Sequence, residues 1–121
     1  MRFISLIFII AILMGCDEKE QLKEWEQYGT QPFNEEQWKQ YNNRLAMLWD
    51  LVRTAHICNL TATELKDVLG RDDGYYLHDT FLAWRLAQES QFVIDIPPGK
   101  KTPEEFFITN PAGIETTYVC E

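Results

Sequence analysis

The apolar run from Phe3 to Met14 constrains this chain most, because it decides how many residues remain to fold. The run holds 12 residues behind Arg2, whereas a helix needs about 20 apolar residues to span a bilayer. A charged start, a short apolar middle and small residues at the end favour a cleaved export signal over a transmembrane helix. Removal of residues 1–15 from the 121-residue chain would leave 106 residues, enough for one small domain.

A cysteine follows the expected cleavage point directly, in the run Leu13-Met14-Gly15-Cys16. This run resembles the lipid-acceptor site of bacterial lipoproteins, and the resemblance implies that Cys16 receives a diacylglyceryl group. Two or more acyl chains are enough for stable anchoring. By the same resemblance, Asp17 matches an inner-membrane retention signal. We therefore expect a lipid-anchored protein on the periplasmic face of a bacterial membrane, with the inner membrane favoured over the outer.

The charge of the chain narrows the range of partners. The sequence has 19 acidic and 11 basic residues, and loss of Arg2 with the signal would change the net charge from −8 to −9. Nucleic-acid binding is not expected, because phosphates are attracted to basic surfaces. A basic partner is compatible with this charge, but so is a solvated acidic surface that binds nothing.

Two of the three cysteines are free to pair with each other. If Cys16 carries lipid, Cys58 and Cys120 remain, and an oxidising periplasm allows them to form a disulfide. The alternative is two unrelated buried thiols. A bridge closing a loop of about 60 residues would contribute roughly 3–4 kcal/mol in the chain-entropy model.

The exported part divides into a polar segment and a domain. Residues 16–32 are rich in Glu, Gln and Lys, with Leu22, Trp25 and Tyr28 as their large apolar groups, and predict a lipid-anchored tether with a docked helical segment. Residues 33–121 predict a single α+β domain. The whole chain is thus expected to comprise a signal peptide over 1–15, the tether and that domain.

Two helices are predicted at the start of the domain. Asn34 is a candidate N-cap, and Phe33 and Trp38 occupy the positions of a hydrophobic staple. Apolar residues then follow at alternating spacings of three and four, which predicts one helix to about Ala55 with a single buried face. These residues are Trp38, Tyr41, Leu45, Leu48, Val52 and Ala55. A capping box at Thr61, closed by Gly70, predicts a second helix over residues 62–69.

The rest of the domain predicts an antiparallel meander of four or five strands. Alternating apolar residues occur over 81–87, 92–96, 106–109 and 114–119, and 75–78 is a possible further strand. Asn110-Pro111-Ala112-Gly113 suits a type I turn between the last two strands. Residues 79–89 remain ambiguous, because Asp79 could also cap a helix there. The predicted architecture is two helices packed on this sheet, with one disulfide.

The run from Leu60 to Gly70, followed by acidic residues and a tyrosine-rich segment, resembles a known family pattern. It is similar to small bacterial lipoproteins with the fold of the β-lactamase inhibitor protein, including an accessory lipoprotein of outer-membrane protein assembly. The similarity covers residues 60–100, about 40 residues. It implies a helix-on-sheet scaffold that binds proteins instead of catalysing a reaction, although fold alone does not fix function.

The sequence predicts no enzyme. Ser90 is the only serine expected to remain after cleavage, and no nucleophile turn surrounds it. His56 and Cys58 are two residues apart and would not face each other on a helix. A metal site could in principle gather from Asp72, Asp73, His78 and Asp79, but a solvated acidic turn is the favoured interpretation. We expect no metal, no cofactor and no small-molecule substrate.

Protein binding has better candidates. Tyr75, Tyr76, Trp84 and Arg85 are residue types that dominate contact hot spots. With Trp84 directed into the core, Arg85 would lie on the exposed face, and Tyr76 and His78 would share one side of their strand. We therefore predict a binding surface of Tyr76, His78 and Arg85.

The leading functional hypothesis is a non-enzymatic envelope protein that binds another protein, as an assembly accessory. The alternative is an inhibitor or immunity protein that acts against an enzyme or toxin in the periplasm.

Overall fold

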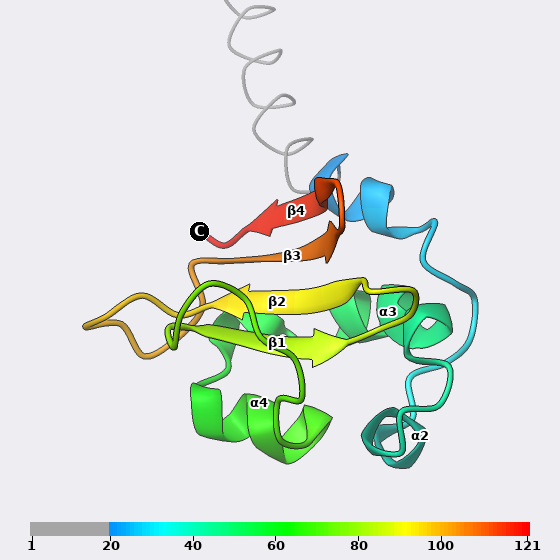
Figure 1. Cartoon of the computed structure of the whole chain (residues 1–121), viewed down its shortest axis with the longest axis horizontal. Helices are drawn as coiled ribbons and strands as arrows, with labels where there is room; N and C mark the ends of the chain where they lie inside the picture. Colours follow the sequence, from blue (N-terminus) through cyan, green and yellow to red (C-terminus); the bar gives the residue numbers. More distant parts are fainter. Residues whose placement is uncertain (1–19) are drawn as a thin grey trace, which may run out of the picture.

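A computed structural model describes residues 20–121, so the expected signal peptide, Cys16 and Asp17 lie outside the described residues. A helical segment over residues 20–25 begins the described chain. It is followed by α2 (Glu35–Lys39), α3 (Arg44–Thr54), the 3-10 helix η1 (Ile57–Asn59), α4 (Ala62–Leu69), β1 (Phe81–Arg85), β2 (Gln91–Asp95), β3 (Glu105–Asn110) and β4 (Gly113–Val119) (Figure 1). Within residues 20–121, no helix is long and apolar enough to cross a membrane.

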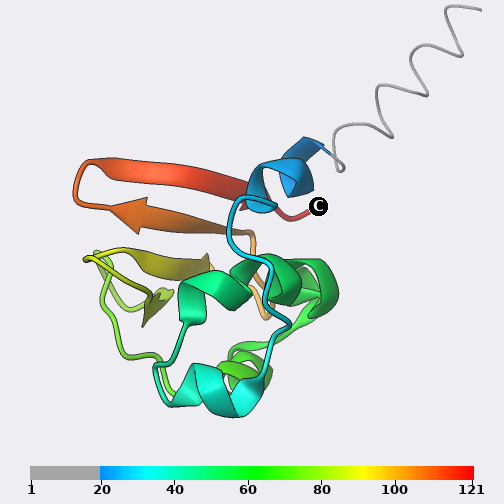
Figure 2. The same ribbon diagram turned by 90° about the vertical axis from the view of Figure 1, so that its right-hand side faces the viewer.

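The four strands form one antiparallel sheet in the order β1-β2-β3-β4. Helices α2, α3 and α4 lie on one side of this sheet (Figure 2). The α+β meander expected from the sequence is therefore confirmed, with four strands. Residues 79–89, which the sequence left between strand and helix, contain β1.

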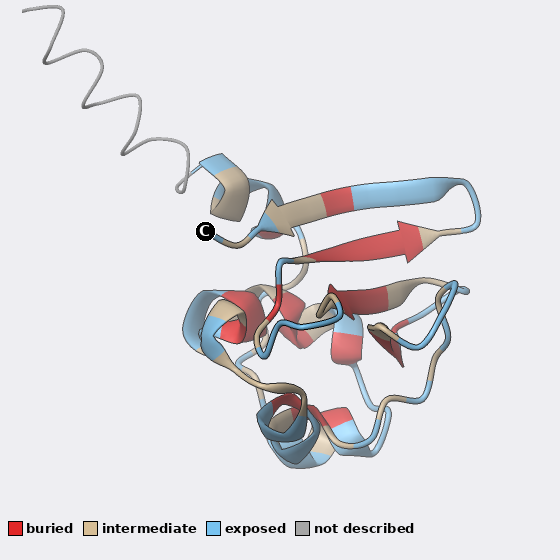
Figure 3. Cartoon of the chain, turned by 90° about the vertical axis from the view of Figure 1, so that its left-hand side faces the viewer, coloured by how far each residue is buried: buried red, intermediate tan, exposed pale blue. Residues whose placement is uncertain are grey.

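Strand alternation separates a large core from a small one. Leu82, Trp84 and Phe92 point toward the helices, where the buried side chains form the main core. On the opposite sheet face, Ala83 and Val93 belong to a second buried cluster. Buried residues accordingly concentrate where the helices and the sheet meet (Figure 3). The inward orientation predicted for Trp84 is confirmed.

The single helix predicted over 34–55 is wrong, because the chain breaks it into α2 and α3. Asn34 does cap α2, accepting a hydrogen bond from the Gln37 N–H at 2.9 Å. The break falls at residues 40–43, where Tyr41 and Asn43 adopt left-handed backbone angles of φ 58° and 56°. Trp38 is consequently buried, whereas Tyr41 and Leu45, expected on the same face, are 49% and 37% exposed.

Helix α4 matches its sequence prediction because its signals are local. The Thr61 side chain accepts from the Glu64 N–H, and the Glu64 side chain accepts from the Thr61 N–H, as a capping box requires. Gly70 follows the last helical residue with φ 78°, in the left-handed region that favours glycine.

Residues 75–78 do not form the possible fifth strand. Gly74 donates one backbone hydrogen bond to the Ala83 carbonyl at 2.8 Å, but the backbone groups of Tyr75 bond the Gln91 side chain instead of a strand. Tyr76 then crosses the sheet face away from the helices, with its ring 5.2 Å from that of Phe107. The segment covers the small core, which is why it does not extend the sheet.

Residues 20–32 pack into the domain. The Trp25 side chain is fully buried, with its ring 5.2 Å from that of Phe106. The Tyr28 hydroxyl lies 2.6 Å from the Thr116 hydroxyl, and the Trp49 N–H donates to the Tyr28 carbonyl at 3.1 Å. The docked helical segment expected in the tether is thus part of the core, and residue 32 marks no break in packing.

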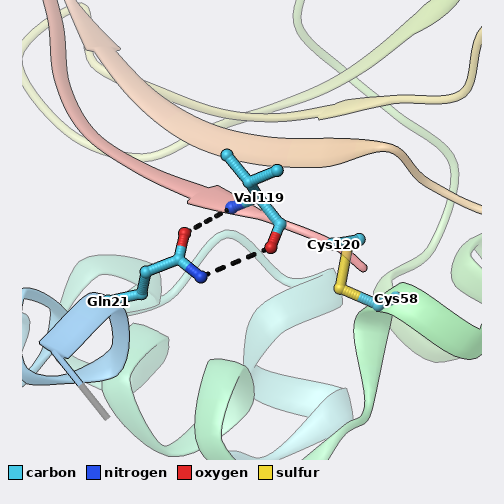
Figure 4. The surroundings of a disulfide bond; sticks show 4 residues. All are labelled: Gln21, Cys58, Val119 and Cys120. Atoms are coloured by element: carbon cyan, nitrogen blue, oxygen red, sulfur yellow. Dashed lines mark hydrogen bonds between the residues drawn. A yellow bond between two sulfur atoms is a disulfide. The ribbon is translucent and has the colours of Figure 1, made fainter. Parts of the chain in front are cut away.

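The expected disulfide between Cys58 and Cys120 is confirmed (Figure 4). It joins η1 to the residue after β4, across a sequence separation of 62. The backbone N–H of Cys120 also donates to the Glu104 carbonyl at 2.9 Å. Cys120 is therefore held by a covalent bond and by a backbone hydrogen bond.

Candidate binding surface

A buried arginine organises the region between the helices and β1. The Arg44 side chain is 3% exposed, and its Nε donates to the Trp38 carbonyl at 2.7 Å. Nη1 donates to the Arg85 carbonyl at 2.9 Å, and Nη2 lies 2.8 Å from an Asp73 carboxylate oxygen. One guanidinium thus ties α2, the loop after α4 and the end of β1 together. Charge-assisted bonds of this kind are among the stronger hydrogen bonds in proteins.

The break between α2 and α3 brings Tyr41 over this cation. The centre of the Tyr41 ring lies 4.6 Å from the Arg44 guanidinium carbon, within cation–π range. The same guanidinium lies 5.2 Å from the centre of the Trp38 ring, on the core side. Tyr41 is thereby held at the surface with nearly half of its area exposed.

A loop segment fixes a second tyrosine beside the first. Asp73 accepts a hydrogen bond from the Arg85 N–H at 2.8 Å. The Gln91 side-chain amide accepts from the Tyr75 N–H at 2.8 Å and donates to the Tyr75 carbonyl at 3.0 Å. The backbone of Tyr75 is therefore anchored on the sheet while 68% of its area stays exposed.

These groups line one open hollow of about 460 Å³. We call it the tyrosine hollow, and its residues are Tyr41, Tyr75, Arg85, Glu89, Ser90 and Gln91. Two of them, Tyr41 and Glu89, have positive φ angles of 58° and 68°. Residues other than glycine, Asn and Asp rarely adopt such angles, and strained backbone tends to cluster at functional sites.

The structure does not bring the three predicted binding residues together. Tyr76 and His78 both contact Phe81, with ring centroids 5.1 and 4.8 Å apart, at the start of β1. Arg85 ends the same strand, four residues or about 14 Å away. Arg85 instead joins Tyr75, which the sequence identified only by its residue type, and Tyr41, which the helical periodicity assigned to the core.

The remaining candidates for chemistry have other roles in the described chain. The Cys58 sulfur is bonded to Cys120, so it offers no thiol to His56. Asp73 pairs with Arg44. Ser90 lines the tyrosine hollow. No group of three or more His, Cys, Asp or Glu residues within 20–121 is arranged to hold a metal ion.

An acidic pair lies between the neighbouring strands β2 and β3. Asp95 and Glu105 are direct partners in the sheet register. Burial raises the pKa of each carboxyl. The negative charge of Glu104 raises the pKa of Asp95 further, and the negative charge of Asp95 raises the pKa of Glu105 further. His78 acts in the opposite direction on the pKa of Asp95. Like charges directly opposite each other destabilise a sheet.

Comparison of the chain with protein families, curated proteins and solved structures gave no match. The resemblance to lipoproteins with the fold of the β-lactamase inhibitor protein therefore stays a prediction.

Proposed function

We propose that this chain is a lipid-anchored periplasmic protein that binds another envelope protein and does so without catalysis. The observation that carries the proposal is the tyrosine hollow, where two exposed tyrosines and an arginine surround one cavity. Tyr and Arg are enriched among the few residues that dominate binding energy at protein interfaces.

The rigidity of the hollow supports this role. Tyr41 rests on the buried Arg44, and Tyr75 is fixed through both backbone groups by Gln91. A binding surface that is already ordered loses less conformational entropy when a partner docks. The Tyr41 ring is thus supported by the Arg44 guanidinium, and the Tyr75 backbone is supported by hydrogen bonds to Gln91.

Anchoring at Cys16 would orient the hollow toward the periplasm. Cys16 precedes Glu20 by four residues, which span at most about 14 Å when extended. The segment 20–25 lies beside β4, at one edge of the sheet (Figure 1). The hollow is lined by Arg85 of β1 and Gln91 of β2, on the other side of the sheet. A partner would therefore approach from the side away from the membrane, which Asp17 suggests is the inner one.

A pull-down from detergent-solubilised membranes tests the binding surface. Tyr75→Ala combined with Arg85→Ala removes two exposed side chains and should reduce partner recovery at least tenfold, since each hot spot costs about 2 kcal/mol. Leu77→Ala is the matched control, because Leu77 is 65% exposed but does not line the hollow. Equal recovery with both variants would remove the hollow as the binding surface.

The captured protein would also distinguish two roles for the same surface. An assembly component would support an accessory function. An enzyme or toxin whose activity falls on binding would support the inhibitor or immunity alternative.

The anchor itself is tested by mass spectrometry of the protein purified from membranes. We expect loss of residues 1–15 and an acylated Cys16. An intact Met1 with an unmodified Cys16 would contradict lipid anchoring and the periplasmic location that depends on it.

A further inference from the structure

The outer edge of β4 already binds one amide group that imitates a neighbouring strand. Gln21 Oε1 accepts from the Val119 N–H at 2.8 Å, and Gln21 Nε2 donates to the Val119 carbonyl at 3.4 Å (Figure 4). A side-chain amide thus satisfies the two groups that an added strand would satisfy. This contact occupies only the last residue of β4.

The preceding part of the edge has no such partner strand. Backbone groups alternate in direction along a strand, so those of Thr117 point to the same outer edge as those of Val119. The sheet order ends at β4, and the described chain brings no fifth strand beside it. A register shift near Glu115 then bends β4, which leaves the segment around Thr117 as the accessible stretch.

A hollow of about 390 Å³ accompanies this edge, between residues 20–25 and β4. Three carboxylates line it, those of Glu20, Glu24 and Glu121, together with Gln21, Thr117 and Val119. None of the three carboxylates forms an ion pair with another residue of the described chain. Val119, on the same strand, keeps 48% of its area exposed.

We propose that this edge binds an extended basic segment of another protein, which adds as a fifth strand beside β4. Main-chain hydrogen bonds to Thr117 would provide the pairing, as in other cases of strand addition. Lys or Arg side chains would face the three carboxylates, and alternate apolar side chains would contact Val119. This surface is at the opposite edge of the sheet from the tyrosine hollow, so the inference goes beyond the proposed function.

The charge of the edge argues against a second copy of this chain as the occupant. A symmetric pairing of two β4 strands would bring both sets of Glu20, Glu24 and Glu121 into one interface. Like-charge contacts of this kind oppose association. A basic segment has the complementary charge.

The experiment uses the full-length protein in detergent and a labelled, capped hexapeptide of sequence Lys-Val-Lys-Thr-Lys-Val. Fluorescence anisotropy should show saturable binding that weakens as salt is added. Hydrogen exchange should slow at the Thr117 amide. A peptide methylated at every backbone nitrogen has the same charge but no backbone N–H donors, and it should not bind.

Matched charge variants separate a local site from a general acidic surface. Combined Glu20→Gln, Glu24→Gln and Glu121→Gln changes should weaken binding at least fivefold at low ionic strength. Glu26→Gln, Glu36→Gln and Asp67→Asn together change the net charge equally but lie elsewhere, and should weaken binding less than twofold. Both sets alter exposed side chains, so both proteins should fold.

Several results would overturn the proposal. These are no binding at millimolar peptide, equal binding of the N-methylated peptide, or equal effects of the two charge variants. A dimer paired through β4 without peptide would assign the edge to a second copy. Because Tyr75→Ala with Arg85→Ala leaves β4 unchanged, failure of the tyrosine hollow would not alter peptide binding.

Discussion

The two edge strands of the sheet, β1 and β4, differ in what covers their outer backbone groups. Along β1, the chain itself lies against the edge, with Gly74 bonded to Ala83 and the Asp73 carboxylate bonded to Arg85. Along β4, the contact is a single glutamine side chain at Val119. Unpaired edges invite further strands, so proteins usually cover them. The comparison indicates that β1 is closed to strand addition and that β4 is open over part of its length.

The two edges also differ in what secures them. The loop against β1 is held by the buried Arg44, through Asp73 and the Arg85 carbonyl. The end of β4 is held by the disulfide to η1. An ionic network therefore fixes the tyrosine hollow, whereas a covalent bond fixes the edge proposed to accept a partner.

The largest expected effect is at the disulfide. Replacing Cys58 and Cys120 by Ala, with Cys16 retained, should lower the free energy of unfolding by about 4 kcal/mol, because a loop spanning 62 positions is no longer closed in the unfolded chain. Chemical denaturation measures the loss, and hydrogen exchange should quicken in β4 more than in β1. A loss below about 1 kcal/mol would contradict this account of the β4 edge.

The next effect is at the buried cation. Arg44→Met should lower the free energy of unfolding by about 3 kcal/mol, because it removes the charged donor to the Trp38 and Arg85 carbonyls and the ionic partner of Asp73. The matched control is Arg53→Met, which removes an exposed ion pair and should cost less than about 1 kcal/mol. Exchange should quicken at the Tyr75 amide but not at the Cys120 amide, which is bonded to the Glu104 carbonyl. Equal quickening at both would mean that the edges are not independent.

A smaller effect isolates the loop against β1. A Cβ added at Gly74 would lie 2.1 Å from Gln91 Oε1, so Gly74→Ala must displace the amide that holds Tyr75. We expect a loss of about 1–2 kcal/mol by overpacking. In a Gln91→Ala background the same change should cost less, and this difference is measured by a double-mutant cycle. If the losses of stability from Gly74→Ala and Gln91→Ala are additive, the added Cβ does not act through the Gln91 side chain.

The smallest effect lies between the edges, at Asp95 and Glu105. Because their folded-state pKa values are raised, the folded protein binds protons more readily there, and stability falls as pH rises above their ordinary values of 3.8 and 4.5. Asp95→Asn should raise the free energy of unfolding at pH 7 by about 0.5 kcal/mol. Denaturation at pH 7 and at pH 3 measures the change, which should shrink at the lower pH.

Asp50 supplies the control of opposite sign for that pH dependence. The Phe33 N–H holds the pKa of Asp50 below its ordinary value of 3.8, with a further contribution from Arg53. The charged Asp50 carboxylate therefore stabilises the folded protein at pH values above the ordinary pKa, and this stabilisation is lost as the pH falls through the lowered pKa. Asp50→Asn should destabilise the protein at pH 7. Effects of the same sign for Asp50→Asn and Asp95→Asn would contradict the assigned causes.

Local signals predicted the elements that depend on neighbouring residues. The capping box at Thr61 and the stop at Gly70 gave the exact bounds of α4. Alternation gave the strands of the sheet and the burial of Trp84. Each of these features is set within a few residues, by backbone groups that must be satisfied or by the period of a strand.

The tyrosine hollow could not be predicted in this way. Its residues come from the break after α2, the loop before β1, the last residue of β1, the turn after it and the first residue of β2. Periodicity favoured a continuous helix through Tyr41, yet the buried Arg44 bonds the Trp38 carbonyl and the Arg85 carbonyl at once. That arrangement depends on residues 41 positions apart, which no local pattern reports.

The sequence by itself predicted the fold class and the order of the strands, because periodicity and capping act locally, and it favoured the pairing of Cys58 with Cys120 over two unrelated thiols. Only the tertiary structure decided how residues 20–32 pack into the core, that the helix predicted to Ala55 becomes two and that the two sheet edges differ. These outcomes depend on which distant polar groups and side chains meet. The burial of Trp25 and Arg44 therefore settled what the pattern of the chain left open.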